Sequence, residues 1–183
     1  MLTKELLRSK FSLFRSSLSP EYRTVAHRRI FHKLISDPHI IDARNICCYV
    51  SHETEVDTHE FIRNCLSKNK QVVVPKVSHQ ILTLHEINSL EECKPGFKGI
   101  LEPPSSNRLC NPELVDVFIV LGLVFDTHKY RIGYGKGYTD RLLEKQRGFK
   151  IGIAYTDQLV YEVPHESHDV PLNTIITDTI TLF

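Results

Sequence analysis

The 183-residue sequence has no apolar run long enough to cross a membrane and no C-x-x-C pair. A spanning helix needs about 18 or more consecutive apolar residues, and no window of this chain comes near that. The five cysteines are odd in number, and two of them, Cys47 and Cys48, are adjacent within an apolar run where reduced cysteine acts as a small hydrophobic residue. We therefore expect a reduced, cytoplasmic protein with no membrane partner and no zinc site.

The sequence also lacks a strong net charge, because 23 Lys and Arg stand against 22 Asp and Glu. Such a molecule has no overall field that favours nucleic acid, so we expect no nucleic-acid partner. The charge is unevenly placed, since residues 1–33 hold eight basic and two acidic residues. This basic N-terminal segment is either a solvated face or a contact surface for an anionic ligand.

Length and composition indicate one folding unit. A chain of 183 residues with a hydrophobic fraction of 41% can enclose one core, and it contains no internal repeat and no low-complexity segment. We expect a single domain over residues 1–183, acting as a monomer.

Two helices are predicted at the N-terminus. Thr3 can cap a helix over about residues 4–17, in which apolar residues at positions 7, 11, 14 and 18 form one stripe. A second stripe, on another face of the same helix, holds Lys4, Arg8 and Arg15. Ser19-Pro20-Glu21 is a helix start signal, and this second helix should run to about residue 35.

Short β-rich runs then alternate with helical ones. We expect strands at residues 45–50, 71–74, 81–87, 114–120, 150–155 and 174–177, and helices at about 58–67 and from 138 onward. Pro75 should stop the second strand, residues 81–87 should form an edge strand, and residues 174–177 the last strand. The proline-rich residues 88–113 should be rich in loops.

This alternation predicts an α/β fold with a mainly parallel sheet and helices on both faces, a Rossmann-like three-layer sandwich. Ligands of such sheets bind beyond the carboxyl ends of the strands.

The most informative motif is RIGYGKGYTDR at residues 131–141. Three of the eight glycines, Gly133, Gly135 and Gly137, fall within a stretch of five residues inside this motif. Glycine accepts positive φ, and consecutive backbone N–H groups can line a concavity for an anion. A helix should begin at Tyr138, and Arg131 and Lys136 add positive charge. The motif is neither a Walker A sequence nor G-x-G-x-x-G, so its spacing predicts a phosphate site, or else a flexible turn, without specifying the phosphate.

Six further short motifs accompany the glycine motif in order along the chain. They are K-x-x-x-R at residues 4–8, EVDT at 55–58, PK at 75–76, GILEP at 99–103, the strand and loop of residues 116–126, and P-x-E-x-H-D at 164–169. Together with the glycine motif, they resemble the 5-formyltetrahydrofolate cyclo-ligase family, also called 5,10-methenyltetrahydrofolate synthetases. The chain departs from the family pattern at Leu121, usually Pro; at Thr139, often aromatic; and at Asn173, often Asp.

The resemblance implies that the chain uses ATP to convert 5-formyltetrahydrofolate into 5,10-methenyltetrahydrofolate, with release of ADP and phosphate. The formyl oxygen becomes a good leaving group after it receives the γ-phosphoryl group, and nitrogen 10 of the folate then attacks the activated carbon. Such a transfer depends on positioning and charge stabilisation rather than on a protein nucleophile. ATP and 5-formyltetrahydrofolate are the implied ligands, and Mg²⁺ is the implied cofactor.

Two alternative functions use the same motif. A sugar-phosphate isomerase or CoA-transferase-like enzyme would hold one phosphate there without ATP, although the pair Lys4 and Arg8 and the two expected carboxylate ligands argue against this. A nucleotide-binding module without catalysis would bind ATP but would not consume it.

The resemblance also assigns roles to single residues. For ATP it implies Lys4, Arg8, Arg131, Gly133, Tyr134, Gly135, Lys136, Gly137, Tyr138 and Thr139. For the folate it implies Val50, Glu55, Tyr134, Gly135, Lys136, Gly137 and Tyr138. It implies Asp140 and Asp169 as Mg²⁺ ligands, and Lys136 and Arg131 as catalytic residues.

Elementary chemistry suits several of these roles. Lys4 and Arg8 lie one helical turn apart on one face. Carboxylates are ligands that Mg²⁺ accepts together with water and phosphate oxygens. The carboxylate of Glu55 can accept from the N–H donors of a pterin edge, and Tyr138 can stack on the folate rings. We interpret His165 and His168 as surface residues and not as metal ligands.

Overall fold

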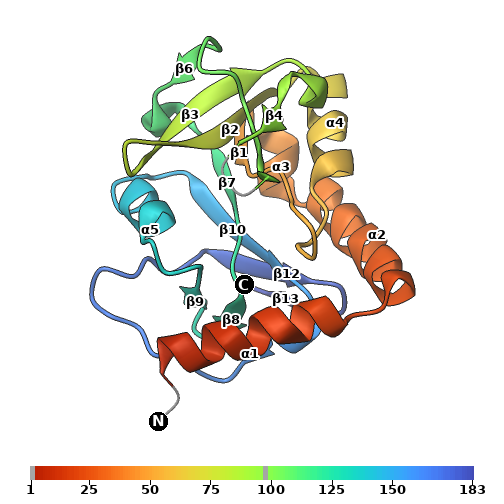
Figure 1. Ribbon diagram of the computed structural model, residues 1–183. Coiled ribbons are helices and arrows are strands. Elements are labelled where there is room, and N and C mark those ends of the chain that lie inside the picture. The colour runs from red at the N-terminus through yellow and green to blue at the C-terminus, as the bar shows by residue number, and fades with distance from the viewer. Residues whose placement is uncertain (1–2, 97–98) are drawn as a thin grey trace.

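The computed structural model describes residues 3–96 and 99–183, and its centre is an eight-stranded mixed sheet (Figure 1). Its strands, in spatial order, are β13 (Thr181–Leu182), β12 (Thr174–Thr177), β10 (Phe149–Ala154), β7 (Val117–Val120), β1 (Asn45–Cys48), β2 (Gln71–Ser78), β3 (Ile81–Ile87) and β6 (Leu109–Cys110). The five strands from β12 to β2 are parallel to one another, and β13, β3 and β6 join antiparallel. The expected α/β fold with a mainly parallel sheet is confirmed, with antiparallel strands at both edges.

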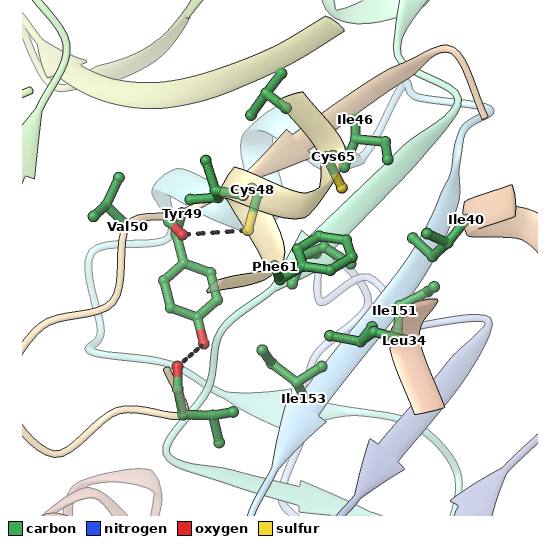
Figure 2. Packing of buried hydrophobic residues seen from close by; sticks show 14 of the residues in the cluster. Leu34, Ile40, Ile46, Cys48, Tyr49, Val50, Phe61, Cys65, Ile151 and Ile153 are labelled. Atoms are coloured by element: carbon green, nitrogen blue, oxygen red, sulfur yellow. Dashed lines mark hydrogen bonds between the residues drawn. The ribbon is translucent and has the colours of Figure 1, made fainter. Parts of the chain in front are cut away.

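One face of the sheet is covered by α2 (Pro20–Ser36), α3 (Pro38–Asp42) and α4 (His59–Ser67). Strand residues alternate between the two faces, so that Ile46 and Cys48 point into this helical layer while Cys47 points to the opposite side. Figure 2 shows Leu34 and Phe61 from the helices packed with Ile46 and Ile151 from the strands. Burial of these apolar side chains is the main favourable contribution to the fold.

The other face is covered mainly by loops, one short helix and a small sheet. Helix α5 (Tyr138–Leu143) buries Leu143 there, and the small sheet has the order β11 (Leu159–Val160), β8 (Val124–Asp126), β9 (Arg131–Ile132). Helix α1 (Lys4–Ser17) lies along this small sheet (Figure 1). Its Leu7 and Phe11 pack in one cluster with Val124 and Ile132. The helical layer expected on this face is therefore reduced to α5. A two-stranded sheet of β4 (Lys94–Pro95) and β5 (Leu101–Glu102) completes the fold.

The N-terminal helices follow the sequence expectation because their start signals are local. Thr3 accepts a hydrogen bond from the backbone N–H of Leu6 at the start of α1, and Ser19 accepts one from Tyr22 at the start of α2. None of the described helices is both long and apolar enough to cross a bilayer.

Several strand predictions need correction. Pro75 does not stop β2, which continues to Ser78. The pairing of β2 with β1 ends at Val73, so beyond that residue β3 is the one paired neighbour among the described strands. A proline without an N–H on the unpaired side therefore costs little. β3 is not an edge strand, because the two-residue strand β6 pairs with it. β1 is two residues shorter than expected, and α3 and the terminal strand β13 were not expected.

Candidate functional site

A cavity of about 730 Å³ lies beyond the carboxyl ends of the central strands. Residues that follow β1 and β7, such as Val50 and Leu121, form its floor, and α1, α5 and the loop between β9 and α5 form its sides. We call this loop, residues 133–137, the glycine loop. The cavity occupies the place that an α/β sheet predicts for its ligand.

Every residue that the sequence assigned to a site lines this one cavity. They are Lys4, Arg8, Val50, Glu55, Arg131, Gly133, Tyr134, Gly135, Lys136, Gly137, Tyr138, Thr139, Asp140 and Asp169. They come from four separate segments of the chain, so the fold brings together groups that are up to 165 positions apart. Their individual roles stay predictions.

The glycine loop has a backbone that only glycine adopts easily at two positions. Gly135 has a φ of 93° and Gly137 a φ of 65°, both in the left-handed region. A side chain at Gly135 would also meet the guanidinium of Arg8 at 3.0 Å. Within the described part of the chain, no hydrogen bond uses the five backbone N–H groups of residues 133–137. These donors are available to an anion.

Arg8 and Lys136 supply positive charge beside the glycine loop. The Nε of Arg8 donates to the carbonyl oxygen of Gly133 at 3.0 Å, which ties α1 to the loop. Lys136 is exposed and, among the described residues, takes part in no ion pair, so its ammonium group is available to a ligand.

Arg131, which is buried, forms an ion pair with the partly exposed Asp140 next to the loop. The Arg131 side chain is only 3% exposed, and its Nη1 lies 3.0 Å from Oδ1 of Asp140. Its Nε donates to the carbonyl oxygen of Leu121 at 3.2 Å. Burial lowers the pKa of Arg131, whereas the charge of Asp140 acts in the opposite direction. The Arg131 guanidinium is thus fixed by contacts within the protein. The Oδ2 atom of Asp140 takes no part in this ion pair.

Lys4 and Asp169 form a second ion pair at the cavity wall. The ammonium of Lys4 lies 2.6 Å from Oδ2 of Asp169 and 3.0 Å from Oε1 of Glu166. Burial acts to lower the pKa of Lys4, but its hydrogen bonds with Asp169 and Glu166 outweigh this and raise it. Burial acts to raise the pKa of Asp169, but the hydrogen bond from Lys4 outweighs this and lowers it. Both groups are therefore charged at neutral pH.

Asp169 also belongs to a group of potential cation ligands. Ligand atoms of Glu166, His168 and Asp169 lie within 4.8 Å of one another. Asp140, the other expected metal ligand, is not in this group. His165, in contrast, stacks on Tyr130 with ring centroids 3.9 Å apart.

Glu55 is linked through Tyr134 to the last turn of α1, whereas Lys4 is in the first turn, and both carboxylate oxygens of Glu55 are engaged. Its Oε1 accepts from the hydroxyl of Tyr134 at 2.7 Å, and its Oε2 accepts from the backbone N–H of His52 at 3.0 Å. Arg15 donates to the same Tyr134 hydroxyl at 2.7 Å. More than half of Tyr134 is exposed, but its hydroxyl end is enclosed between Arg15 and Glu55. Burial there raises the pKa of Tyr134 to about 12, and the charge of Glu55 adds to the effect.

Among the cavity residues to which the sequence assigned no role, Arg15, His52 and Glu166 form polar contacts with residues that it did assign. Arg15 carried a usable signal, because it continues the basic stripe of Lys4 and Arg8 on α1. His52 contributes through its backbone, which no sequence pattern marks.

The fold and the cavity together define an α/β protein that presents a glycine-rich anion loop, basic side chains and carboxylates to one ligand space. The model of the 5-formyltetrahydrofolate cyclo-ligase family matches residues 1–178, so the chain belongs to this family. It is a ligase of the class that converts 5-formyltetrahydrofolate into 5,10-methenyltetrahydrofolate, and the family uses ATP.

Relatives and solved structures agree with this placement. The 5-formyltetrahydrofolate cyclo-ligase of Escherichia coli K12 is 28% identical over 171 residues, which cover 89% of this chain and 93% of that protein. The 5,10-methenyltetrahydrofolate synthetase of Aquifex aeolicus has a structure with a TM-score of 0.89 and 34% identity, covering 99% of this chain and 92% of that one. The synthetase of Mycoplasma pneumoniae gives a TM-score of 0.80 at 25% identity, covering 96% and 98%.

Proposed function

We propose that the cavity binds ATP and 5-formyltetrahydrofolate side by side and couples them in two steps. The γ-phosphoryl group passes from ATP to the formyl oxygen, and ADP forms. Nitrogen 10 of the folate then attacks the formyl carbon, loses its proton, and expels the oxygen as phosphate, which closes the ring of 5,10-methenyltetrahydrofolate. The observation that carries this proposal is the glycine loop, because its unpaired backbone N–H groups and the carboxylate of Glu55 line the same cavity.

The triphosphate would lie along the glycine loop. Unpaired backbone N–H groups supply hydrogen bonds to phosphate oxygens without reorganisation, and Arg8 and Lys136 supply full charge. Lys136 has a side chain free to follow the phosphoryl group as it moves. Arg131 is buried next to the loop, so its contribution would be to hold Asp140 and the loop in place.

Asp140 and Asp169 are the carboxylates that would hold Mg²⁺ at this site. Asp140 would present its Oδ2, and Asp169 would present Oδ1, since its Oδ2 is bound to Lys4. A bound Mg²⁺ would neutralise negative charge on the phosphate oxygens and so favour transfer of the γ-phosphoryl group. Lys4, paired with Asp169, would orient that carboxylate and place its own charge near the phosphates.

The folate would occupy the half of the cavity lined by Val50 and Glu55. A carboxylate can accept two hydrogen bonds from a pterin edge, and each oxygen of Glu55 still has a free lone pair after its contacts with Tyr134 and His52. Val50 supplies apolar surface, and Tyr138, stacked under Arg141, supplies an aromatic ring at the loop end.

Turnover with the purified protein tests the proposal. Incubation with ATP, Mg²⁺ and 5-formyltetrahydrofolate should raise the absorbance of the methenyl product and release one ADP for each product formed. Controls without folate and without ATP should give neither signal. ADP release that does not depend on the folate would contradict the coupled reaction, and binding of ATP without any turnover would favour the non-catalytic module.

A further inference from the structure

Arg15 is a buried cation whose charge is poorly compensated by the protein. It lies in the last turn of α1 and is 6% exposed. None of the ion pairs among residues 3–96 and 99–183 includes it, and its Nε is buried without a hydrogen-bond partner. Taking a guanidinium out of water in this way costs free energy. Stability alone would favour an apolar residue here, so the charge indicates a functional use.

Among the described residues, the one hydrogen bond of the Arg15 side chain leads through Tyr134 to Glu55. Arg15 Nη2 donates to the hydroxyl oxygen of Tyr134 at 2.7 Å, and its guanidinium centre lies 5.8 Å from the Tyr134 ring centroid. Arginine can only donate, so the single hydroxyl hydrogen of Tyr134 is left for Oε1 of Glu55, 2.7 Å away. The positive charge of Arg15 polarises that hydroxyl and strengthens its bond to the carboxylate.

This relay fixes the orientation of the Glu55 carboxylate from both sides. The Tyr134 hydroxyl holds Oε1 and the backbone N–H of His52 holds Oε2. A carboxylate held at both oxygens has lost its rotational freedom before the ligand arrives, so the ligand does not have to supply that ordering.

Arg15 is also remote from the proposed phosphate end of α1. It lies eleven positions after Lys4, or about 16 Å along the helix axis. A change at Arg15 should therefore act on the folate half of the cavity and leave the nucleotide half unchanged.

We propose that Arg15 is a positioning residue for the folate, which acts through the hydroxyl of Tyr134 to hold the Glu55 carboxylate ready for the pterin edge. The inference rests on the proposed role of Glu55. It also makes Tyr134, which lies between the first two glycines of the loop, the link between the glycine loop and the folate pocket.

The test compares Arg15→Met, Tyr134→Phe and the double variant, with Lys10→Met as a matched change at an exposed position of the same helix. Loss of a hydrogen bond to a charged group should raise the KM for 5-formyltetrahydrofolate about tenfold in each relay variant, with the KM for ATP within about twofold. Because Arg15 acts through Tyr134, the double variant should be no worse than Tyr134→Phe alone. Lys10→Met should match the wild type.

A structural role would give a different pattern. Equal rises in both KM values, or a lower thermal midpoint for Arg15→Met, would overturn the inference, because removal of an uncompensated buried charge should leave the midpoint unchanged or higher. Additive effects in the double variant would overturn the relay. Calorimetric titration with 5-formyltetrahydrofolate alone, without ATP, measures the same loss of affinity independently of turnover. Wild-type protein that binds the folate but does not turn it over would contradict the proposed function and leave the relay to be decided by this titration.

Discussion

At the scale of single residues, the cavity separates two kinds of charge. Arg131 and Lys4 are already paired with Asp140 and Asp169, whereas Lys136 is exposed and unpaired among the described residues. Side chains in an ion pair keep their positions, whereas an unpaired cation is available to stabilise the negative charge that develops during phosphoryl transfer.

Lys136→Ala should therefore reduce turnover strongly while leaving the fold intact. Loss of one preorganised charge at a transferring phosphoryl group should lower kcat about 100-fold or more. The measurement is steady-state ADP release under saturating ATP. Lys145→Ala, at an exposed position after α5, is the control, and wild-type kcat for Lys136→Ala would remove Lys136 from the reaction.

Glu55→Gln should weaken the folate more than the nucleotide. Glutamine keeps the size of the side chain but replaces one acceptor oxygen by a donor and removes the charge. We expect the KM for 5-formyltetrahydrofolate to rise about tenfold or more, and that for ATP to change little. If the ATP KM moved more than the folate KM, Glu55 would belong to the nucleotide half.

The Lys4–Asp169 pair makes an acid-dependent contribution to stability. Because the folded-state pKa of Asp169 lies below its ordinary value of 3.8, this contribution is fully present above that value and is lost as the pH falls through the folded pKa. Asp169→Asn should therefore lose less stability than the wild type between about pH 5 and pH 2. Denaturant unfolding at a series of pH values measures this, and parallel curves for the two proteins would contradict it.

At the scale of elements, α1 is the part that decides whether the site is complete. It carries Lys4, Arg8 and Arg15 to the cavity, but its attachment to the small sheet depends on Leu7 and Phe11. The packing of the apolar face of α1 thus positions the basic side chains on its other face.

Phe11→Ala should consequently reduce both stability and activity. Phe11 is 4% exposed, and a Phe to Ala change in a core costs about 3–5 kcal/mol. Leu13→Ala, at a side chain that is 72% exposed on the same helix, should cost less than about 0.5 kcal/mol. Urea unfolding of both variants checks the difference, and similar losses would mean that α1 is not anchored by this contact.

At this scale, the sequence predicted those helix and strand boundaries that are determined by residues close to them in the chain. The starts of α1 and α2 depend on Thr3 and Ser19-Pro20 and were predicted to the residue. The continuation of β2 through Pro75 depends on which side of the strand has a neighbour, which is a tertiary fact. The role of Arg15 depends on Tyr134, 119 positions away, so the basic stripe located Arg15 but gave no partner for it.

At the scale of the whole molecule, the sheet gathers the ends of β1 and β7, the glycine loop and α1 around one cavity. Every candidate residue that the resemblance implied lines this cavity, because the motifs of a family reflect the fold that its members share. They did not predict how the second face is covered, since the small sheet has strands of two or three residues, too short for a periodic pattern.

The measurement that tests this account most directly is a crystal structure with a non-hydrolysable ATP analogue and 5-formyltetrahydrofolate. We predict that the triphosphate accepts hydrogen bonds from the backbone N–H groups of residues 133–137, with Lys136 at its γ-phosphate and the pterin edge on Glu55. A nucleotide bound elsewhere, with these N–H groups facing only solvent, would contradict it.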